Sequence, residues 1–251
     1  MNTFLHTRVL GVQPSLTTRA LTPGMAAALP SSLGGRDSLR AAGCLLVALP
    51  VFLQAPWVRL APFSAALFTA PLLLVAVLLA QSPSKRWSTA GTLLVGFCGS
   101  WLGGCLFWGW CRLHPLWHLP IEAFALPLAL GGLNNRWRLA ASFYLASLVG
   151  TAVTDGVMAI TGVMQHWTEV LEAPIQLAPA LLQQAALGVL EPLPLAVTVG
   201  VATLLIDLCR RFWQHPDGAW RLAASALATT LAVDGLFLAA ALWSPHWSGL
   251  I

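Results

Sequence analysis

The chain contains seven long apolar stretches between Leu39 and Trp243, and nearly every lysine and arginine lies in the gaps between them. An apolar run of about 17 residues or more is long enough to cross the hydrocarbon core of a bilayer as a helix. Only helices and closed barrels satisfy all of their backbone hydrogen bonds there. Apolar residues make up 57% of the chain, charged residues make up 9%, and the mean hydropathy is +0.75. The sequence therefore predicts an all-α, polytopic transmembrane helical bundle.

We expect about seven spans, of which the fourth is the shortest and therefore the weakest prediction. The expected spans are Leu39–Trp57, Pro62–Ala80, Thr89–Trp110, Leu119–Leu133, Leu139–Met164, Pro192–Cys209 and Leu222–Trp243. An eighth apolar segment, residues 175–190, begins near Pro174 and Pro179 and is short for a span. We expect it to lie along the outer surface or to re-enter the membrane partway.

The distribution of basic residues predicts which way the bundle is inserted. With the N-terminus in the cytoplasm, the inner side carries most of the basic residues, and the outer side carries only Arg59 and Arg112. The inner residues are Arg36, Arg40, Lys85, Arg86, Arg136, Arg138, Arg210, Arg211 and Arg221. Cytoplasmic loops are enriched in Lys and Arg, so this bias favours an N-in, C-out topology. If residues 175–190 spanned the membrane, the last three of these arginines would lie outside and the bias would be lost.

The chain divides into a short N-terminal segment and one membrane domain. At about 30 residues per span and loop, residues 38–251 form a single transmembrane domain. Residues 1–37 differ in composition, because Arg8 and Arg19 occur there with many Ser and Thr, and no acid precedes Asp37. This composition is typical of a disordered tail or of a targeting peptide. A translation start at Met25 would also explain it.

Acidic residues lie inside or beside the expected spans, where an isolated carboxylate costs several kcal/mol. Asp155 lies about 24 Å along the fifth span from its inner end, and Asp234 lies about 18 Å along the seventh, at 1.5 Å per residue. Glu122 and Glu191 stand at the outer ends of the fourth and sixth spans. All four acids therefore belong to the outer half of the membrane. Asp207 is near Arg210 at the inner end, which predicts a local ion pair.

The loop before Glu122 adds Arg112, His114 and His118 at the same level. One interpretation is a polar pocket that opens outward and holds a cation, a proton or a polar head group. The other is a set of hydrogen bonds and an arginine–glutamate pair that fix helix packing. Both interpretations are open at the level of the sequence.

Two parts of the chain resemble each other, which predicts an internal repeat of residues 119–164 and 192–243. The segment Trp137–Ser142 recurs unchanged as Trp220–Ser225, and each copy is followed by a Thr-x-x-x-Asp-Gly pattern. Parallel repeats of this kind occur in transporters. The pattern places Thr151 one turn before Asp155 and Thr230 one turn before Asp234, so each hydroxyl could bond to the carboxyl on its own helix. We expect Asp155 and Asp234 to face one another or a shared cavity.

Several functional classes are disfavoured by the absence of their motifs. The sequence has no phosphate-binding or dinucleotide loop, no His-Glu-x-x-His and no Gly-x-Ser-x-Gly. No cysteine or histidine spacing fits a metal site, so we expect neither a metal nor another cofactor. The net charge of +4 arises from short basic loops, which are explained by membrane orientation rather than by nucleic-acid binding. An enzyme is disfavoured, although not excluded, because no nucleophile and base are recognisable.

Four segments carry a resemblance to a known family. The segments Gly109–Trp110, His114–Ala123, Gly150–Asp155 and Val233–Gly235 resemble an uncharacterised multi-pass membrane protein family of cyanobacteria, a domain of unknown function. The resemblance runs from about Leu39 to Leu242. It implies a plasma or thylakoid membrane, and it supplies no mechanism.

Two hypotheses for function follow from the sequence. One is a non-catalytic membrane protein that assists the assembly of a membrane complex, with Trp-rich and Gly-rich helices as docking faces for a membrane-protein partner. The other is a small transporter or channel-like protein for a cation, a proton or a polar solute, which uses the outer acids. The sequence favours the first hypothesis slightly, because no polar path continues through the inner half. In both hypotheses the protein is embedded in the lipid bilayer.

Overall fold

A computed structural model describes residues 36–245, and this part of the chain consists of helices and turns without strands. Six of its helices are long and apolar enough to cross a membrane. They are Asp37–Leu60, Pro62–Ala80, Lys85–Cys111, Arg138–Ile160, Pro192–Gln214 and Gly218–Trp243. The expected all-α bundle is therefore confirmed. The expected N-terminal tail falls outside the described residues except for its end, where the first helix begins at Arg36.

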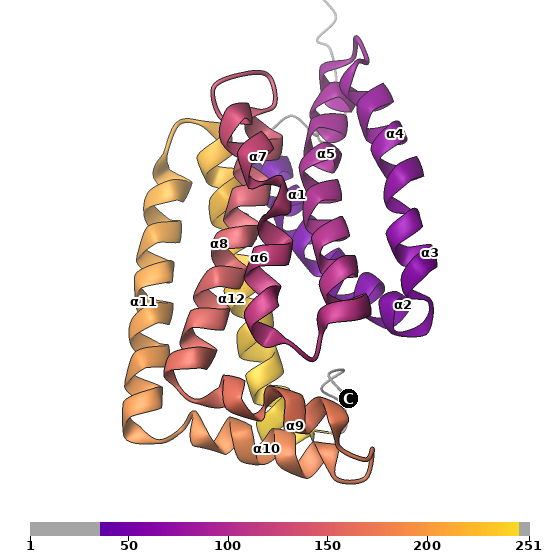
Figure 1. The fold of residues 1–251 in the computed structure, drawn as a ribbon. Coiled ribbons are helices and arrows are strands. Elements are labelled where there is room, and N and C mark those ends of the chain that lie inside the picture. Colours follow the sequence, from indigo (N-terminus) through magenta and orange to yellow (C-terminus); the bar gives the residue numbers. More distant parts are fainter. Residues whose placement is uncertain (1–35, 246–251) are drawn as a thin grey trace, which may run out of the picture. The chain divides into compact units, whose positions relative to one another are not determined.

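Each of the first three long spans consists of two or more consecutive helical elements, whereas each of the last three is one α-helix; shorter helices lie between the third and fifth spans (Figure 1). The first three spans comprise α1 (Arg36–Leu49), η1 (Pro50–Gln54), α2 (Ala55–Leu60), α3 (Pro62–Leu67), α4 (Thr69–Ala80), α5 (Lys85–Leu106) and η2 (Phe107–Cys111). The next elements are η3 (Pro115–Trp117), α6 (His118–Glu122), η4 (Ala123–Ala125), α7 (Leu126–Gly132) and α8 (Arg138–Ile160). The last elements are η5 (Val163–His166), α9 (Trp167–Glu172), α10 (Ala178–Gly188), α11 (Pro192–Gln214) and α12 (Gly218–Trp243).

The expected fourth span, Leu119–Leu133, is not a continuous helix, and in this respect the prediction was wrong. The segment is divided into α6, η4 and α7, and it is not among the six long helices. Pro127 explains the break, because it has no N–H to bond the carbonyl of Ala123, and its ring would clash with that carbonyl in a continuing α-helix. The segment still runs from the end of α5 back to the start of α8 (Figure 1).

The only tyrosine of the chain, Tyr144 on α8, bridges the break. Its hydroxyl donates a hydrogen bond to the carbonyl oxygen of Glu122, and it accepts one from the backbone N–H of Ala125 at 3.2 Å. Backbone groups left without partners in a membrane cost several kcal/mol each. The buried Tyr144 side chain therefore stabilises the junction between α6 and α7.

The basic loops gather at one end of the bundle. The start of α1, the α4–α5 turn, the α7–α8 turn and the α11–α12 turn lie together at the top of Figure 1. We call this the basic end and define it by Arg40, Arg86, Arg138 and Arg211. The ion pair between Arg138 and Asp217, 2.5 Å long, joins the starts of α8 and α12 there. The grouping agrees with the predicted topology, while the assignment of the basic end to the cytoplasm stays a prediction.

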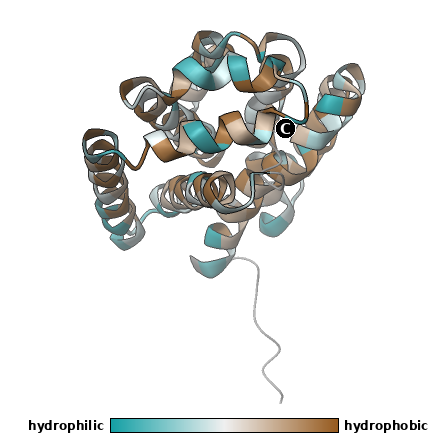
Figure 2. Ribbon diagram, turned by 90° about the horizontal axis from the view of Figure 1, so that it is seen from below, coloured by the Kyte–Doolittle hydropathy of each residue, from teal (hydrophilic) through white to brown (hydrophobic). Residues whose placement is uncertain are grey.

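Residues 175–190 do not cross the bundle. They contain α10, which has 11 residues, is not among the six long helices, and lies across the ends of the long helices opposite the basic end (Figure 1). Seen from that end, the ribbon alternates between hydrophilic and hydrophobic residues in the short helices nearest the viewer (Figure 2). This arrangement agrees with the expected surface position.

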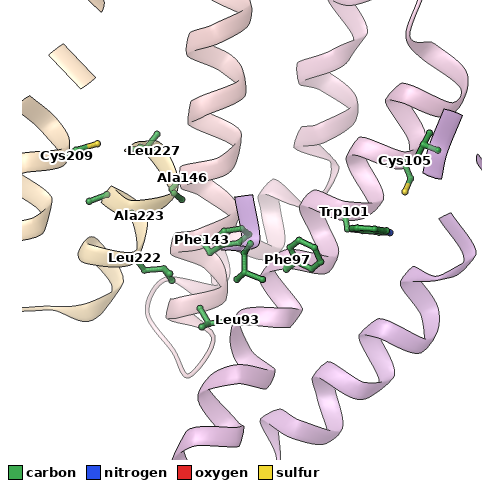
Figure 3. Packing of buried hydrophobic residues seen from close by; sticks show 14 of the residues in the cluster. Leu93, Phe97, Trp101, Cys105, Phe143, Ala146, Cys209, Leu222, Ala223 and Leu227 are labelled. Atoms are coloured by element: carbon green, nitrogen blue, oxygen red, sulfur yellow. The ribbon is translucent and has the colours of Figure 1, made fainter. Parts of the chain in front are cut away.

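The hydrophobic core lies between α5, α8 and α12 (Figure 3). Leu93, Phe97 and Trp101 recur every fourth residue on one face of α5, as expected for a helix that buries one side. Phe143 of α8 is buried in the same cluster with Leu222 of α12. This core packs α8 and α12 side by side, and these two helices carry Asp155 and Asp234.

Candidate functional site

Two of the four predicted acids of the outer half lie on either side of one histidine. His118, the first residue of α6, lies between Glu122 of the same helix and Asp155 of α8. Its Nδ1 is 3.1 Å from Asp155 Oδ1, and its Nε2 is 3.3 Å from Glu122 Oε1. The side chains of the three residues are 14%, 16% and 15% exposed, in the order His118, Glu122, Asp155. We call these three residues the acid–histidine cluster.

An aromatic ring covers the histidine of this cluster. The ring of Phe107 is fully buried and stacks on the imidazole of His118, with centroids 4.1 Å apart and planes inclined by 26°. Phe107 is the first residue of the π-helical turn η2 at the end of the third span. Such turns are often found at functional sites. The stacked ring restricts access of water to one face of the imidazole.

Gly103 on α5 allows Glu122 to lie close to the third span. A Cβ atom at position 103 would be 3.1 Å from the Cα of Glu122, which is tighter than an ordinary contact. Helices approach each other closely in membranes where small residues lie at the contact. The absence of a side chain at Gly103 therefore helps to place the Glu122 carboxylate beside His118.

Two threonines of α8 connect the cluster to its surroundings. Thr151 donates a hydrogen bond to Glu122 Oε2 at 2.8 Å, and Thr154 donates one to Asp234 Oδ2 of α12 at 2.6 Å. The expected bonds from each threonine to the acid one turn later on its own helix are replaced by these contacts. Thr230 instead donates to the carbonyl of Ala226 at 3.2 Å. The hydroxyls of α8 therefore link α6, α8 and α12.

Glu191, the last of the four acids predicted for the outer half, lies away from the cluster. It is exposed at the start of α11 and lines a cavity of about 190 Å³ together with His166 and Gln184. Arg112 and His114 are also exposed, and the backbone carbonyl of Arg112 accepts a hydrogen bond from the indole N–H of Trp167 at 2.6 Å. Of the predicted outer loop, the structure thus brings only His118 into the cluster.

The predicted ion pair at the inner end of α11 forms with a different arginine. Asp207 Oδ2 lies 2.7 Å from Arg211 Nη2, rather than beside Arg210. Residues three and four apart on a helix are both neighbours, so the spacing alone did not decide between the two arginines. Because Asp207 pairs with Arg211, the side chain of Arg210 has no carboxylate partner among residues 36–245.

The charge balance of the cluster favours protonated histidine. Burial disfavours the imidazolium, but the carboxylates of Asp155 and Glu122 outweigh this effect and raise the pKa of His118 to about 9. His118 is the first residue of α6 and lies outside the six long spans. An imidazolium here neutralises one carboxylate, so the remaining acids require further cations or protons.

The geometry suits protons better than a metal ion. The two nitrogens of an imidazole point away from each other, and each faces a different carboxylate, so the ligand atoms do not converge on one point. Within residues 36–245, no group of three or more His, Cys, Asp or Glu residues is arranged to hold a metal ion. Hydrogen bonds from both ring nitrogens to acids are the arrangement through which a proton can be exchanged.

Four contributors to this site were not predicted from the sequence, namely Phe107, Gly103, Tyr144 and Thr154. Thr154 directly precedes Asp155, so it faces a different neighbour, and the repeated pattern drew attention to Thr151 instead. Tyr144 had a signal in the composition, because a single tyrosine in a chain with 12 tryptophans is unusual. Nothing in the sequence indicated that it would bond across a helix break.

The predicted repeat of residues 119–164 and 192–243 stays a prediction. Its second helices, α8 and α12, run side by side in the same direction (Figure 1). Its first parts differ, because residues 119–133 form broken short helices whereas α11 is one helix of 23 residues. The two glutamates that support the repeat also occupy different surroundings.

Comparison with known proteins places the chain in a family. A family model described as a protein of unknown function, DUF3120, matches residues 43–242. No curated protein and no solved structure matches the chain. The matched region contains all six long helices except the first residues of the first span and the last residue of the sixth, and it includes the acid–histidine cluster. The chain therefore belongs to the DUF3120 family of proteins of unknown function.

Proposed function

We propose that this membrane protein binds and releases protons at the acid–histidine cluster and couples them to the movement of a cation or a small polar solute. The observation that carries the proposal is the position of His118 between Asp155 and Glu122. Ionisable residues within a membrane bundle are costly, and they commonly mark proton relays and substrate pathways. Asp234 adds a third acid through its hydrogen bond from Thr154.

The charge of the site supports the same function. Three carboxyl groups and one imidazole lie close together, and His118 in its charged form compensates only one carboxylate. The remaining charge has to be balanced by bound protons or by a cation taken up from outside. A cation that binds to these carboxyl groups replaces protons held there, so its uptake releases protons. This exchange is the elementary step of a proton-coupled transporter.

The second hypothesis is a role in the assembly of a membrane complex, with the glycine-rich face of α5 as a docking surface. The packing of α5 argues against that surface. The third span is the most buried of the six, with 61% of its apolar stretch buried by the rest of the chain. A Cβ at Gly91 would clash with α4, and one at Gly96 would clash with the backbone of Ala140 on α8. The glycine-rich face is therefore occupied within the chain.

The resemblance found in the sequence supports a plasma or thylakoid membrane as the location.

Proteoliposomes that contain a pH-sensitive dye test the proposal. Gradients of Na⁺, K⁺, Mg²⁺ and small amines are imposed in turn, and we expect at least one of them to drive a proton flux. Asp155→Asn and His118→Gln should abolish this flux, whereas His166→Gln should retain it, because the half-exposed His166 side chain lies outside the cluster, 3.4 Å from Glu169. A flux that survives Asp155→Asn would contradict the assigned site. Absence of flux with every solute, combined with stable co-purification of a membrane complex, would favour the assembly role.

A further inference from the structure

A groove between α11 and α12 near the basic end is not used by the acid–histidine cluster. Its volume is about 330 Å³. It is lined by Ile206, Cys209, Arg210 and Trp213 of α11 and by Ala228, Leu231 and Ala232 of α12. The lining is apolar except for Arg210 at one end. The groove therefore combines a hydrophobic floor with a single cationic group.

On the α12 side, two of the three lining residues are alanines, whose small side chains leave space beside α11. Ala228 and Ala232 are one helical turn apart and lie on the same face of α12. Opposite them, Ile206 is exposed, and only 6% of the residues in the apolar stretch of α11 are buried by the rest of the chain. α11 is thus a peripheral helix, and the groove beside it opens to the surrounding bilayer.

The groove extends along part of α11, one of the six long helices. The lining residues extend from Ile206 to Trp213, which is about 10 Å along α11 at 1.5 Å per residue. Arg210 and Trp213 belong to the last turns of α11, at the basic end, and Ile206 lies deeper in the span. Tryptophan and arginine are typical of the interfacial level of a membrane, where lipid head groups lie.

The charges at the mouth of the groove favour an anionic group. Arg211 is engaged with Asp207 at 2.7 Å, whereas Arg210 is exposed and has no carboxylate partner among residues 36–245. The guanidinium of Arg40, which also pairs with the exposed Asp37 at 3.7 Å, lies 6.0 Å from the ring centroid of Trp213. It brings a second cation to the same mouth. Two arginines beside an apolar groove match a phosphate attached to a hydrocarbon chain.

We propose that this groove binds one molecule of an anionic phospholipid, with one acyl chain between α11 and α12 and the phosphate at Arg210. The site is separate from the acid–histidine cluster, and it does not depend on the function proposed above. The charge of the mouth selects an anionic head group, and the alanines of α12 provide the space for the chain.

Native mass spectrometry of the detergent-purified full-length protein tests the site. Phosphatidylglycerol and phosphatidylcholine with identical acyl chains are titrated separately, and we expect phosphatidylglycerol to bind more tightly. Arg210→Gln should weaken phosphatidylglycerol binding about fivefold, the effect expected for one arginine near an anionic lipid. Inorganic phosphate in tenfold excess should not displace the lipid, because it cannot occupy the apolar part of the groove.

Two further variants distinguish a specific site from general attraction to the basic end. Ala232→Leu fills the groove without removing a charge, and it should lower phosphatidylglycerol binding to the same degree. Arg86→Gln is the matched control, since Arg86 also lies at the basic end and 5.8 Å from a tryptophan ring, that of Trp87, but does not line the groove. Equal losses in Arg86→Gln and Arg210→Gln, or unchanged binding in Ala232→Leu, would overturn the proposal. Thermal unfolding of each variant confirms that it is folded.

Discussion

Gly150 of α8 lies against Thr230 of α12, and a Cβ atom at position 150 would be 3.0 Å from both the Oγ1 and the Cγ2 of that threonine. One turn further along the same two helices, Thr154 donates its hydrogen bond to Asp234. The missing side chain at Gly150 therefore allows the two helices to approach closely enough for the polar contact to form. Packing and the candidate site are linked at this point.

We predict that Gly150→Ala destabilises the protein. Overpacking of a close contact costs about 1–3 kcal/mol. Alanine also favours a helix over glycine by up to about 1 kcal/mol, which partly offsets the loss. Gly156→Ala is the matched control, because Gly156 lies on the same helix and a Cβ atom added there would have no neighbour within 4 Å. Thermal unfolding in detergent should therefore give a lower Tm for Gly150→Ala than for Gly156→Ala, and equal values would refute the close contact.

A double-mutant cycle tests the hydrogen bond between Thr154 and Asp234. We expect Thr154→Val and Asp234→Asn to be non-additive in the free energy of unfolding, with a coupling of about 0.5–3 kcal/mol, because they remove the two ends of one interaction. Thr154→Val combined with Asp207→Asn is the control cycle, since Asp207 pairs with Arg211 near the basic end. Additivity in the first cycle would mean that the bond contributes nothing to stability.

Asp155→Asn and Asp234→Asn should also be non-additive. The two acids are joined through adjacent residues, because Thr154, which bonds Asp234, precedes Asp155 in the chain. A change at one carboxyl therefore alters the surroundings of the other, and sites that share a network are not independent. The free energy of unfolding of both single variants and the double variant provides the test. Strictly additive effects would show that the two carboxyls act independently.

The stability of the protein should depend on pH through His118. The pKa of His118 is raised from 6.5 to about 9 in the folded protein, so the charged imidazole stabilises the folded state. This stabilisation is fully present below pH 6.5, and it is lost as the pH rises through about 9. We expect the Tm of the wild type to fall over that range relative to His118→Gln. His166→Gln should behave like the wild type, and an unchanged difference between pH 6 and pH 10, a range of about four units, would exclude the interaction.

The orientation of the bundle in the membrane can be tested by cysteine labelling. The five native cysteines are removed, and one cysteine at a time replaces Arg86, Asn135 or Gln214. All three positions lie in or beside turns at the basic end and should be labelled by an impermeant reagent only from the cytoplasmic side. A cysteine at Gln165, near the opposite end, should be labelled only from outside. Labelling of position 214 from outside would mean that residues 175–190 cross the membrane.

The long spans could be predicted because a bilayer imposes a simple requirement on length and polarity. Each stretch such as Pro62–Ala80 is apolar for the full thickness of the membrane, and the basic turns repeat on one side. The fourth segment was predicted wrongly as a single helix, because hydropathy measures polarity and takes no account of a proline inside the run. Pro127 was visible in the sequence, and its effect on the carbonyl of Ala123 would have signalled the break.

The site could be predicted in part for a related reason. Acids such as Asp155 and Asp234 are conspicuous in apolar spans, so their positions were found from the sequence alone. Which acid faces which helix depends on rotation and register, and these are set by contacts such as that of Gly150 with Thr230. Glu122 and Glu191 had equivalent positions in the sequence, but only Glu122 lies beside a histidine of the cluster. Side-chain partners across helices are not encoded in the spacing of one segment.

The hydrogen bonds of Tyr144 across the broken fourth segment affect how the acid–histidine cluster is attached to the bundle. Tyr144 and Thr151 bind α6 and its junction to α8 at two levels, so the segment that carries His118 is anchored to α8. Asp234 belongs to α12 and reaches this unit through the hydroxyl of Thr154. A change in the protonation of the cluster would therefore act on the boundary between α8 and α12 rather than within α6. The outer part of the bundle therefore consists of α6, which is anchored to α8, and of α12, which meets that unit at the hydrogen bond between Thr154 and Asp234.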